Sequence, residues 1–570
     1  MENSFSSEKT KTRLPLPIGV SSYVEAVSNY YYVDKTLLIR DFIDALPKVS
    51  LFTRPRRFGK TLNMDMLRVF FEKPEGNEAE DTSVYFRDKE IWNCGEKYRS
   101  MQGQYPVIFL TFKDVKYQTW KEARKDIWDN IRMEFSRHSS VMECEGCSNF
   151  EKDLYCKILA GNADEVDMAR SLALLSAMLH KQYGKPAVVI IDEYDTPIQQ
   201  GHLHGYYDEV IGFLRNLFSG VLKDNADLAY GFLTGILRVA KESIFSGLNN
   251  LKVNTIMDDR YSAYFGFTRD EVQDLLMAYG CADHYEEVCD WYDGYRFGNS
   301  EIFNPWSVIN YVDDGCVPRA FWQATGSNDV IGEIIQNASP EVTENLRSLL
   351  QGGQVTTYID TNVIYPEISQ NPSTIYSFLL VAGYLKTAEI MPRSDGNFVC
   401  RVAIPNKEIS LVYEKEIISR LSMPDSESTA AKIQQALMIG DIPSLTSSIT
   451  DYMLKTISVH DTAGEAFYQG LMLGLCAILN NRYEVLSNRE SGLGRFDIQL
   501  CPLDQNLPGY ILELKASRKE NGKSLDSLAE DALNQIEEKQ YDQEMKQKRV
   551  NRIIKIGIAF HGKNAAVRYQ

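Results

Sequence analysis

The segment Arg54-Pro-Arg-Arg-Phe-Gly-Lys-Thr61 decides the fold class of the first half of the chain. It lies between a short apolar run, residues 48–52, and residues 62–71, whose Leu, Met and Phe side chains recur at the spacing of an amphipathic helix. A strand, a basic turn ending in Gly-Lys-Thr and a helix together form the context of a phosphate-binding loop. Because the usual first glycine is Arg54 here, the segment alone is also compatible with an ordinary basic turn.

A phosphate loop in this place predicts a specific task for each of its polar residues. The N–H groups and the dipole of the following helix would attract phosphates. Lys60 would reach the β- and γ-phosphates, and the Thr61 hydroxyl would bind Mg²⁺. The expected nucleotide-binding residues of the loop are Arg57, Phe58, Gly59, Lys60 and Thr61.

A second motif favours nucleotide binding over the ordinary turn. The apolar run 187–191 leads directly into Asp192-Glu193, the form of a Walker B strand. Asp192 would hold Mg²⁺ through water at the carboxyl end of the strand, where open α/β sheets bind their ligands. Glu193 would polarise an attacking water. The two motifs in this order predict ATP and Mg²⁺ as cofactors.

Further apolar runs, at residues 106–112, 228–234 and 252–256, alternate with helical patterns and indicate an α/β fold with a parallel sheet. In phosphate-loop folds with an additional strand, the strand after Walker B inserts between the two motif strands. Residues 228–234 are placed to do so, which would bring Thr234 near the γ-phosphate as a polar sensor. Arg238 would add positive charge in the transition state, a surface position being the alternative.

Several longer motifs resemble, in order, the AAA-ATPase-like family of uncharacterised bacterial proteins. The similarity covers most of residues 13–310, and the family loop also tends to lack the first glycine. The similarity to this family implies ATP binding and leaves open whether ATP is hydrolysed. The motifs are TRPRRFGKT (53–61), IIDEYDTP (190–197), LTGILRVAKESIFSGLNN (233–250), WYDGYRFG (291–298) and FNPWSV (303–308).

A second group of chemically suited residues lies near the end of the chain. Residues 496–501 and 509–515 are predicted strands joined by a turn at 504–506, and a hairpin centred there places Asp497 directly opposite Glu513. Cross-strand partners have Cβ atoms about 4.5–5.5 Å apart, close enough to share one Mg²⁺. Lys515 points to the same face as Glu513. Two carboxylates and a lysine suit metal-assisted phosphodiester hydrolysis.

This arrangement resembles the PD-(D/E)XK nuclease superfamily, and specifically the nuclease-like domain found behind AAA-ATPase-like domains. The similarity covers about residues 435–562 and implies two further site residues, Glu465 in the first helix and Gln535 in the helix after the Glu513 strand. Arg495-Phe496 stands where a proline is often seen before the aspartate. Domains of this fold can also lose metal chemistry and serve as binding modules.

The charge balance limits the class of partner. The chain has 61 Lys and Arg against 78 Asp and Glu, a net charge of −17, which excludes a protein coated in basic surface. Residues 545–570 nevertheless carry seven cations and no acid, which suits a phosphate backbone or, alternatively, a solvated strand edge. Nucleic acid is therefore the expected partner of the last domain.

The sequence predicts an α/β multidomain protein with three parts: a phosphate-loop domain over residues 1–285, a mostly helical and possible winged-helix region over 286–430, and a nuclease-like domain over 431–570. The aromatic residues within 291–306 would form a core or inter-domain seam, or stack nucleobases. Residues 423–429 are the expected linker.

No run reaches the roughly 18 apolar residues of a membrane helix, and ten scattered cysteines suit a reducing cytoplasm. The sequence leaves open whether the protein forms a homo-oligomer. The hypothesis is an ATP-binding domain coupled to a Mg²⁺-dependent nuclease acting on DNA or RNA. The alternative is a signalling or scaffold NTPase whose last domain only binds nucleic acid or protein.

Overall fold

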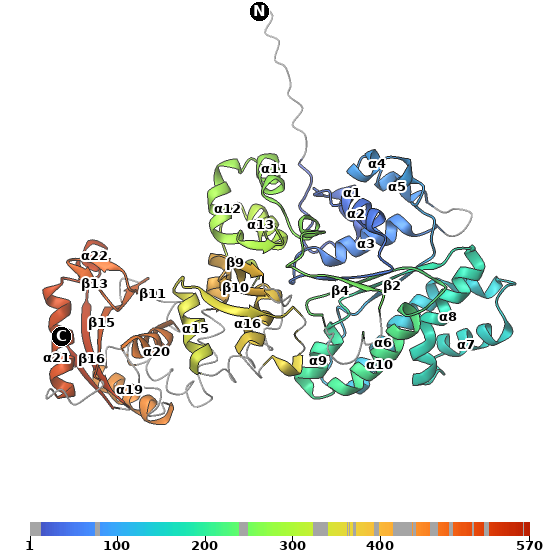
Figure 1. Cartoon of the computed structure of the whole chain (residues 1–570). Coiled ribbons are helices and arrows are strands. Elements are labelled where there is room, and N and C mark those ends of the chain that lie inside the picture. Colours follow the sequence, from blue (N-terminus) through green and yellow to red (C-terminus); the bar gives the residue numbers. More distant parts are fainter. Residues whose placement is uncertain are drawn as a thin grey trace, which may run out of the picture. The chain divides into compact units, whose positions relative to one another are not determined.

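The chain divides into two compact units, residues 1–413 and 414–570. The predicted boundary at 285/286 falls inside the first unit, and the predicted linker 423–429 lies outside the described residues. The three-domain division itself stays a prediction. The computed structural model (Figure 1) describes residues 13–74, 80–238, 245, 249–322, 340–361, 363, 365–368, 372–392, 398–413, 436, 441–456, 465–477, 483–503, 507–517, 524–562 and 564–570.

A five-stranded parallel sheet organises the first unit. β4 pairs with β1 on one side and with β3 on the other, which confirms the predicted insertion of residues 228–234 between the two motif strands. β3 is buried along its whole length, as expected for a parallel strand covered on both faces. The strands in spatial order are β2 (Val107–Thr111), β3 (Ala187–Asp192), β4 (Leu228–Gly235), β1 (Val49–Thr53) and β5 (Leu251–Asn254).

Helices cover both faces of this sheet (Figure 1). The first group of helices packs on one face and the second group on the other, so the carboxyl ends of the strands form one edge between the two layers. The first group is α1 (Tyr23–Asn29), α2 (Leu37–Ala45) and α3 (Lys60–Phe71). The second group is α6 (Trp120–Arg137), α7 (Asn149–Leu159), α8 (Glu165–Tyr183), α9 (Thr196–His204) and α10 (Tyr207–Leu222).

The rest of the first unit is mainly helical, as predicted, with two small antiparallel sheets. Helices α11 (Arg269–Tyr279), α12 (Tyr285–Tyr292) and α13 (Pro305–Asp313) share one apolar cluster. Between α12 and α13 lies the hairpin of β6 (Tyr295–Phe297) and β7 (Ser300–Ile302). Beyond them come α15 (Pro340–Leu350), α16 (Pro372–Val381) and the sheet of β8 (Val355–Ile359), β10 (Phe398–Ala403) and β9 (Lys386–Pro392).

The second unit is a mixed sheet with helices on both faces. β15 and β16 are parallel, and the other neighbours are antiparallel. The strands in spatial order are β11 (Tyr483–Ser487), β14 (Ile498–Pro502), β15 (Gly509–Ala516), β16 (Ile553–His561) and β17 (Asn564–Tyr569). The helices are α19 (Ile442–Thr456), α20 (Glu465–Ala477), α21 (Leu525–Glu538) and α22 (Gln543–Gln547), and a small hairpin pairs β12 (Glu490–Ser491) with β13 (Gly494–Arg495).

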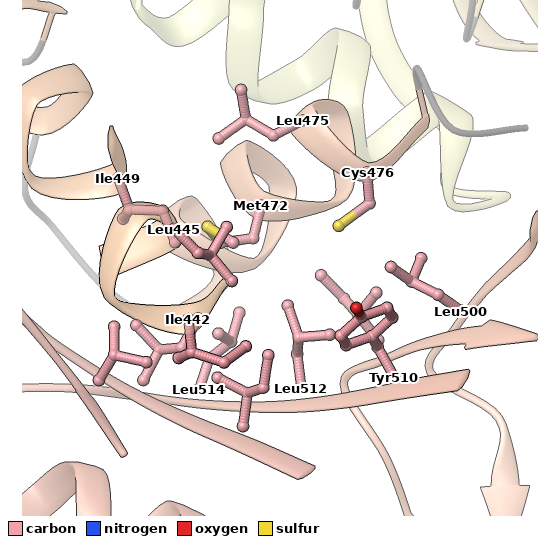
Figure 2. Packing of buried hydrophobic residues seen from close by; sticks show 14 of the residues in the cluster. Ile442, Leu445, Ile449, Met472, Leu475, Cys476, Leu500, Tyr510, Leu512 and Leu514 are labelled. Carbon is pink, nitrogen blue, oxygen red and sulfur yellow. The ribbon is translucent and has the colours of Figure 1, made fainter. Parts of the chain in front are cut away.

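Strand alternation divides β15 between two cores. Figure 2 shows Tyr510, Leu512 and Leu514 facing the apolar side chains of α19 and α20. Ile511 packs instead with residues of α21. Because side chains alternate along a strand, Glu513 and Lys515 belong to the α21 face of the sheet.

None of the helices in the described part of the chain is long and apolar enough to cross a membrane.

Candidate functional site

The phosphate loop turns into α3 at Gly59, whose left-handed backbone (φ 76°) suits glycine. Helix α3 begins at Lys60, two residues before the predicted start, so its first unbonded N–H groups lie within the loop. The Lys60 ammonium folds back and donates to the carbonyls of Arg54 at 3.1 Å and Pro55 at 2.8 Å. Burial lowers the pKa of Lys60, while the nearby carboxylates of Glu193, Asp195 and Asp192 oppose that shift.

The two predicted motifs meet at the carboxylate of Asp192. Thr61 Oγ1 donates to Asp192 Oδ2 at 2.8 Å, and Thr234 Oγ1 donates to Asp192 Oδ1 at 2.6 Å. Thr111, which the sequence reasoning missed, donates to Oδ2 at 3.3 Å from the end of the neighbouring strand β2. Its position at the carboxyl end of a parallel strand was the signal that could have found it. Burial first, and Glu193 second, raise the pKa of Asp192.

Thr234 contacts the Walker B segment on two sides. Besides donating to Asp192, its hydroxyl accepts from the Glu193 N–H at 3.2 Å, and the side chain is fully buried. In this arrangement Thr234 positions the carboxylate, and contact with a γ-phosphate stays a prediction. Arg238 is half-buried three residues beyond the end of β4, and its charge contribution also stays a prediction.

Arg54 stands where a phosphate loop usually has its first glycine, and its side chain is held by contacts with neighbouring elements. The side chain is completely buried, and Nη1 donates to the carbonyls of Thr53 at 2.8 Å and Asn254 at 2.9 Å. The guanidinium carbon lies 5.1 Å from the ring centre of Phe265 and 5.4 Å from that of Phe297. Burial lowers the pKa of Arg54 to about 10, so it is still a cation at neutral pH. The arginine therefore ties the base of the loop to β5.

The outer side of the loop packs against the hairpin β6–β7 and the start of α13. Phe58 is buried, with ring centres 4.9 Å from Tyr295 and 5.2 Å from Phe297. The guanidinium of Arg57 lies 4.2 Å from the ring centre of Trp306. Because Tyr295 and Phe297 are themselves buried, these two side chains form a seam with Phe58 and are closed to nucleobases.

In the second unit, the register of the predicted hairpin is confirmed. Ile498 pairs with Leu512 and Gln499 with Ile511, so the next position places Asp497 opposite Glu513. Asp497 Oδ2 accepts from the Leu514 N–H at 2.8 Å, which holds the carboxylate at the end of the ladder. The turn 504–506 lies outside the described residues.

Glu513 is the most deeply buried acid of this site, at 3% exposure. Gln535 Nε2 from α21 donates to Oε1, and the Lys515 ammonium lies 3.6 Å from the same oxygen. Oε2 is buried without a hydrogen-bond partner among the described residues. Burial, and then the charge of Asp497, raise the pKa of Glu513 to about 8. Without an added cation the carboxyl is therefore mainly protonated at neutral pH.

Helix α20 supplies the remaining polar groups. Glu465 is exposed at the first described position of the helix, and its charge raises the pKa values of both Asp497 and Glu513. Gln469 was missed, although it follows Glu465 by one helical turn. Its Nε2 donates to Asp497 Oδ1 at 3.2 Å and to Asn488 Oδ1 at 3.0 Å. The structure thus brings together the five residues predicted for this site, which are three acids, a lysine and a glutamine.

The residues present fit a divalent cation. One oxygen of Glu513 has no hydrogen-bond partner among the described residues, and the pKa values of Glu513 and Asp497 are both raised. Both features are expected of two neighbouring carboxylates whose negative charges a bound cation would neutralise. Among the described residues no three His, Cys, Asp or Glu side chains cluster as a metal cage. The site therefore offers two carboxylates, which leaves the other positions to water or substrate, as Mg²⁺ prefers. In the first unit, Thr61 and Asp192 offer a comparable oxygen pair.

Of the seven cations within residues 545–570, predicted as a phosphate-binding site or a solvated strand edge, four form ion pairs, and contact with a phosphate backbone stays a prediction. Lys546 pairs with Asp542 at the start of its own helix, and Lys548 pairs with Glu544 of that helix and with Glu484 of β11. Lys555 pairs with Asp542 and with Glu537 of α21, and Arg568 pairs with Asp526 of α21. Arg549 and Arg552 precede Ile553, which pairs with Gly509 at the end of β15 away from Glu513. The sequence alone does not show the pairs with Glu484, Glu537 and Asp526, because these acids come from other elements. Lys563 lies outside the described residues.

Comparison with known proteins agrees with both parts. Residues 17–245 match the model of a predicted AAA-ATPase family, and residues 463–569 match a family of the PD-(D/E)XK nuclease superfamily. The chain is also similar to the "Uncharacterized protein in vnfD 5'region" of Azotobacter chroococcum mcd 1. The two are 24% identical over 447 residues, which cover 77% of each chain. The chain therefore joins a predicted AAA-ATPase domain to a domain of the PD-(D/E)XK nuclease superfamily.

Proposed function

We propose that this chain is a Mg²⁺-dependent nuclease, acting on DNA or RNA, whose activity responds to ATP bound in the first unit. The observation that carries the proposal is the buried Glu513, with one oxygen held by Gln535 and the other without a partner among the described residues. A binding module has no need of a buried, partly unpaired acid, which costs free energy. A metal site uses such an acid directly.

The chemistry is divided among few residues. Asp497 and Glu513 would hold Mg²⁺, which supplies Lewis-acid polarisation of the phosphate and a bound water of lowered pKa. Lys515 lies beside Glu513 and is placed to stabilise the developing negative charge or to position the nucleophile. Gln535 fixes the orientation of Glu513, and Glu465 adds negative charge at the rim.

The ATP site uses the other set of predicted residues. Lys60 would exchange its two loop carbonyls for phosphate oxygens, and Thr61 and Asp192 would hold Mg²⁺. Glu193 would orient water if ATP is hydrolysed. The nucleotide is proposed to act as a switch, because Phe58 and Arg57 of the loop contact the β6–β7 and α13 elements directly.

The nuclease proposal is tested with purified full-length protein, Mg²⁺ and labelled single- and double-stranded DNA and RNA. Wild type should cleave at least one of these, and Asp497→Asn and Lys515→Ala should each lose at least a hundredfold in rate. Lys548→Ala, which removes an ion-paired lysine of the same unit, is the matched control and should cleave normally. Cleavage that survives both site substitutions contradicts the assignment. Binding without cleavage in Mg²⁺ would support the scaffold alternative.

The ATP proposal has a separate test. Millimolar ATP·Mg²⁺ should raise the melting temperature of wild type by mass action and leave that of Lys60→Ala unchanged. An unchanged wild-type melting temperature would contradict nucleotide binding without affecting the nuclease assignment.

A further inference from the structure

An exposed apolar side chain stands next to the nuclease site. Leu493, at the tip of the hairpin β12–β13, is 69% exposed, among the most exposed large hydrophobic side chains described. Arg489 precedes the hairpin and Arg495 ends it, and both are exposed. Two residues beyond Arg495 the chain reaches Asp497.

The hairpin tip is held in a fixed position. Gly492 (φ 60°) lies so close to the turn after α21 that an added Cβ would stand 2.3 Å from the Gln540 carbonyl oxygen. The Leu493 N–H donates to the Lys539 carbonyl at 2.7 Å, and Ser491 Oγ donates to the Tyr541 carbonyl at 3.0 Å. The exposure of Leu493 therefore belongs to an ordered element.

The supports of the hairpin are the same groups that position the carboxylates. At its base, Gln469 bonds both Asn488, next to Arg489, and Asp497. Under its tip, the Tyr541 hydroxyl accepts from Gln535 Nε2 at 3.3 Å, and Gln535 also donates to Glu513. The hairpin and the metal-binding carboxylates thus form one connected element of the structure.

The cations at this hairpin differ from Lys546, Lys548, Lys555 and Arg568, which form ion pairs. Arg489, Arg495 and the neighbouring Lys539 are exposed and form no ion pair with any residue that the structure describes. The acid Glu490 faces Arg495 across the hairpin. Free guanidinium groups beside a phosphodiester-cleaving site are complementary to the phosphates on either side of the scissile one.

We infer that the hairpin β12–β13 is the contact surface for the nucleic-acid substrate, with Arg489, Arg495 and Lys539 on backbone phosphates and Leu493 packed against a base or sugar. This inference rests on the proposed nuclease function. An apolar side chain pressed against or between bases bends or unstacks the strand, which would present the backbone to Asp497 and Glu513.

The test measures binding of a labelled oligonucleotide that wild type cleaves, by full-length protein in EDTA so that no cleavage occurs, over a range of KCl concentrations. Arg489→Ala and Arg495→Ala should each weaken binding and reduce the slope of log Kd against log salt concentration by about 0.7–0.9. Leu493→Ala should weaken binding about 5- to 10-fold and leave that slope unchanged, because it removes an apolar contact. Glu490→Gln should tighten binding, since it removes a charge that repels phosphate.

Lys546→Ala and Arg568→Ala, which remove ion-paired cations, are the matched controls and should keep wild-type affinity and slope. All of these side chains are exposed, so melting temperatures should stay at the wild-type value. If wild type binds and cleaves while the hairpin variants match it in affinity and slope, the inference is overturned and the nuclease function stands. If wild type neither binds nor cleaves any oligonucleotide, the nuclease function itself has failed, and the inference fails with it.

Discussion

At the scale of single residues, Arg54 occupies the position of the first glycine of a phosphate loop and makes contacts that glycine cannot. Its hydrogen bond to the Asn254 carbonyl and its packing on Phe265 and Phe297 involve residues 200 to 243 positions later in the chain. The sequence shows the missing glycine but not its replacement, because these partners become neighbours only when β5 pairs with β1. The same holds for Thr111, whose role depends on β2 lying beside β3.

Glu408 gives a prediction about pH. It is completely buried, accepts from Ser307 Oγ at 2.7 Å and from the Trp322 N–H at 2.9 Å, and burial raises its pKa from 4.5 to about 7. At pH values between 4.5 and about 7, the Glu408 carboxyl has lost its proton in the unfolded chain and has kept it in the folded chain. The free energy of unfolding therefore falls as the pH rises through this range and levels off above about pH 7. The difference amounts to about 3 kcal/mol. Glu408→Gln should remove this part of the pH dependence.

The measurement is urea unfolding of wild type and Glu408→Gln at pH 5 and pH 8. The variant should gain stability relative to wild type on going from pH 5 to pH 8. Equal changes in both proteins would show that the Glu408 carboxyl is already ionised at pH 5.

Gln535 gives a prediction about the pH profile of cleavage. Its amide donates to Glu513 and so favours the ionised carboxylate that a metal ion needs. Gln535→Leu should raise the pKa of Glu513 further, and the acidic limb of the cleavage profile should move to higher pH. A merely structural defect would lower the rate equally at every pH, which initial rates in Mg²⁺ from pH 6 to pH 9 distinguish.

At the scale of elements, the sequence predicted the arrangement of strands better than their contacts. The turn at residues 504–506 and strict alternation were enough to place Asp497 opposite Glu513, because a one-residue slip would expose Leu512 and Leu514. The seam between the phosphate loop and the hairpin β6–β7 was one of two alternatives for residues 291–306. Only the burial of Tyr295 and Phe297 selects it.

This seam gives a stability prediction. Phe58 is 1% exposed between Tyr295 and Phe297, so Phe58→Ala should cost about 3–5 kcal/mol of unfolding free energy. Phe150, at 75% exposure in α7, is the matched control, and Phe150→Ala should change stability by less than about 0.5 kcal/mol. Chemical denaturation of the three proteins measures both values. Equal stabilities would show that the loop does not depend on the hairpin.

At the scale of the whole molecule, the two compact units should respond to different ligands. In calorimetry, ATP·Mg²⁺ at a hundred times its Kd should stabilise the transition of residues 1–413 by about 2.7 kcal/mol. Lys60→Ala should abolish that shift and leave the other transition unchanged. Mg²⁺ alone should raise the transition of residues 414–570, and Glu513→Ala should remove that response. A single transition that responds to both ligands would contradict independent units.

The order of the parallel sheet also has a consequence for the time at which the protein can fold during synthesis. Val49 of β1 pairs with Gly231 of β4 and with Leu251 of β5, so the first strand made has no neighbour until about 180 further residues have left the ribosome. At roughly 5–20 residues per second, the edge of β1 that pairs with β4 waits for about 9–36 s, and the edge that pairs with β5 waits for about 10–40 s. The nascent chain therefore carries an unpaired apolar strand through much of its translation, and a slower ribosome or a truncated product would prolong its exposure to aggregation and to chaperones.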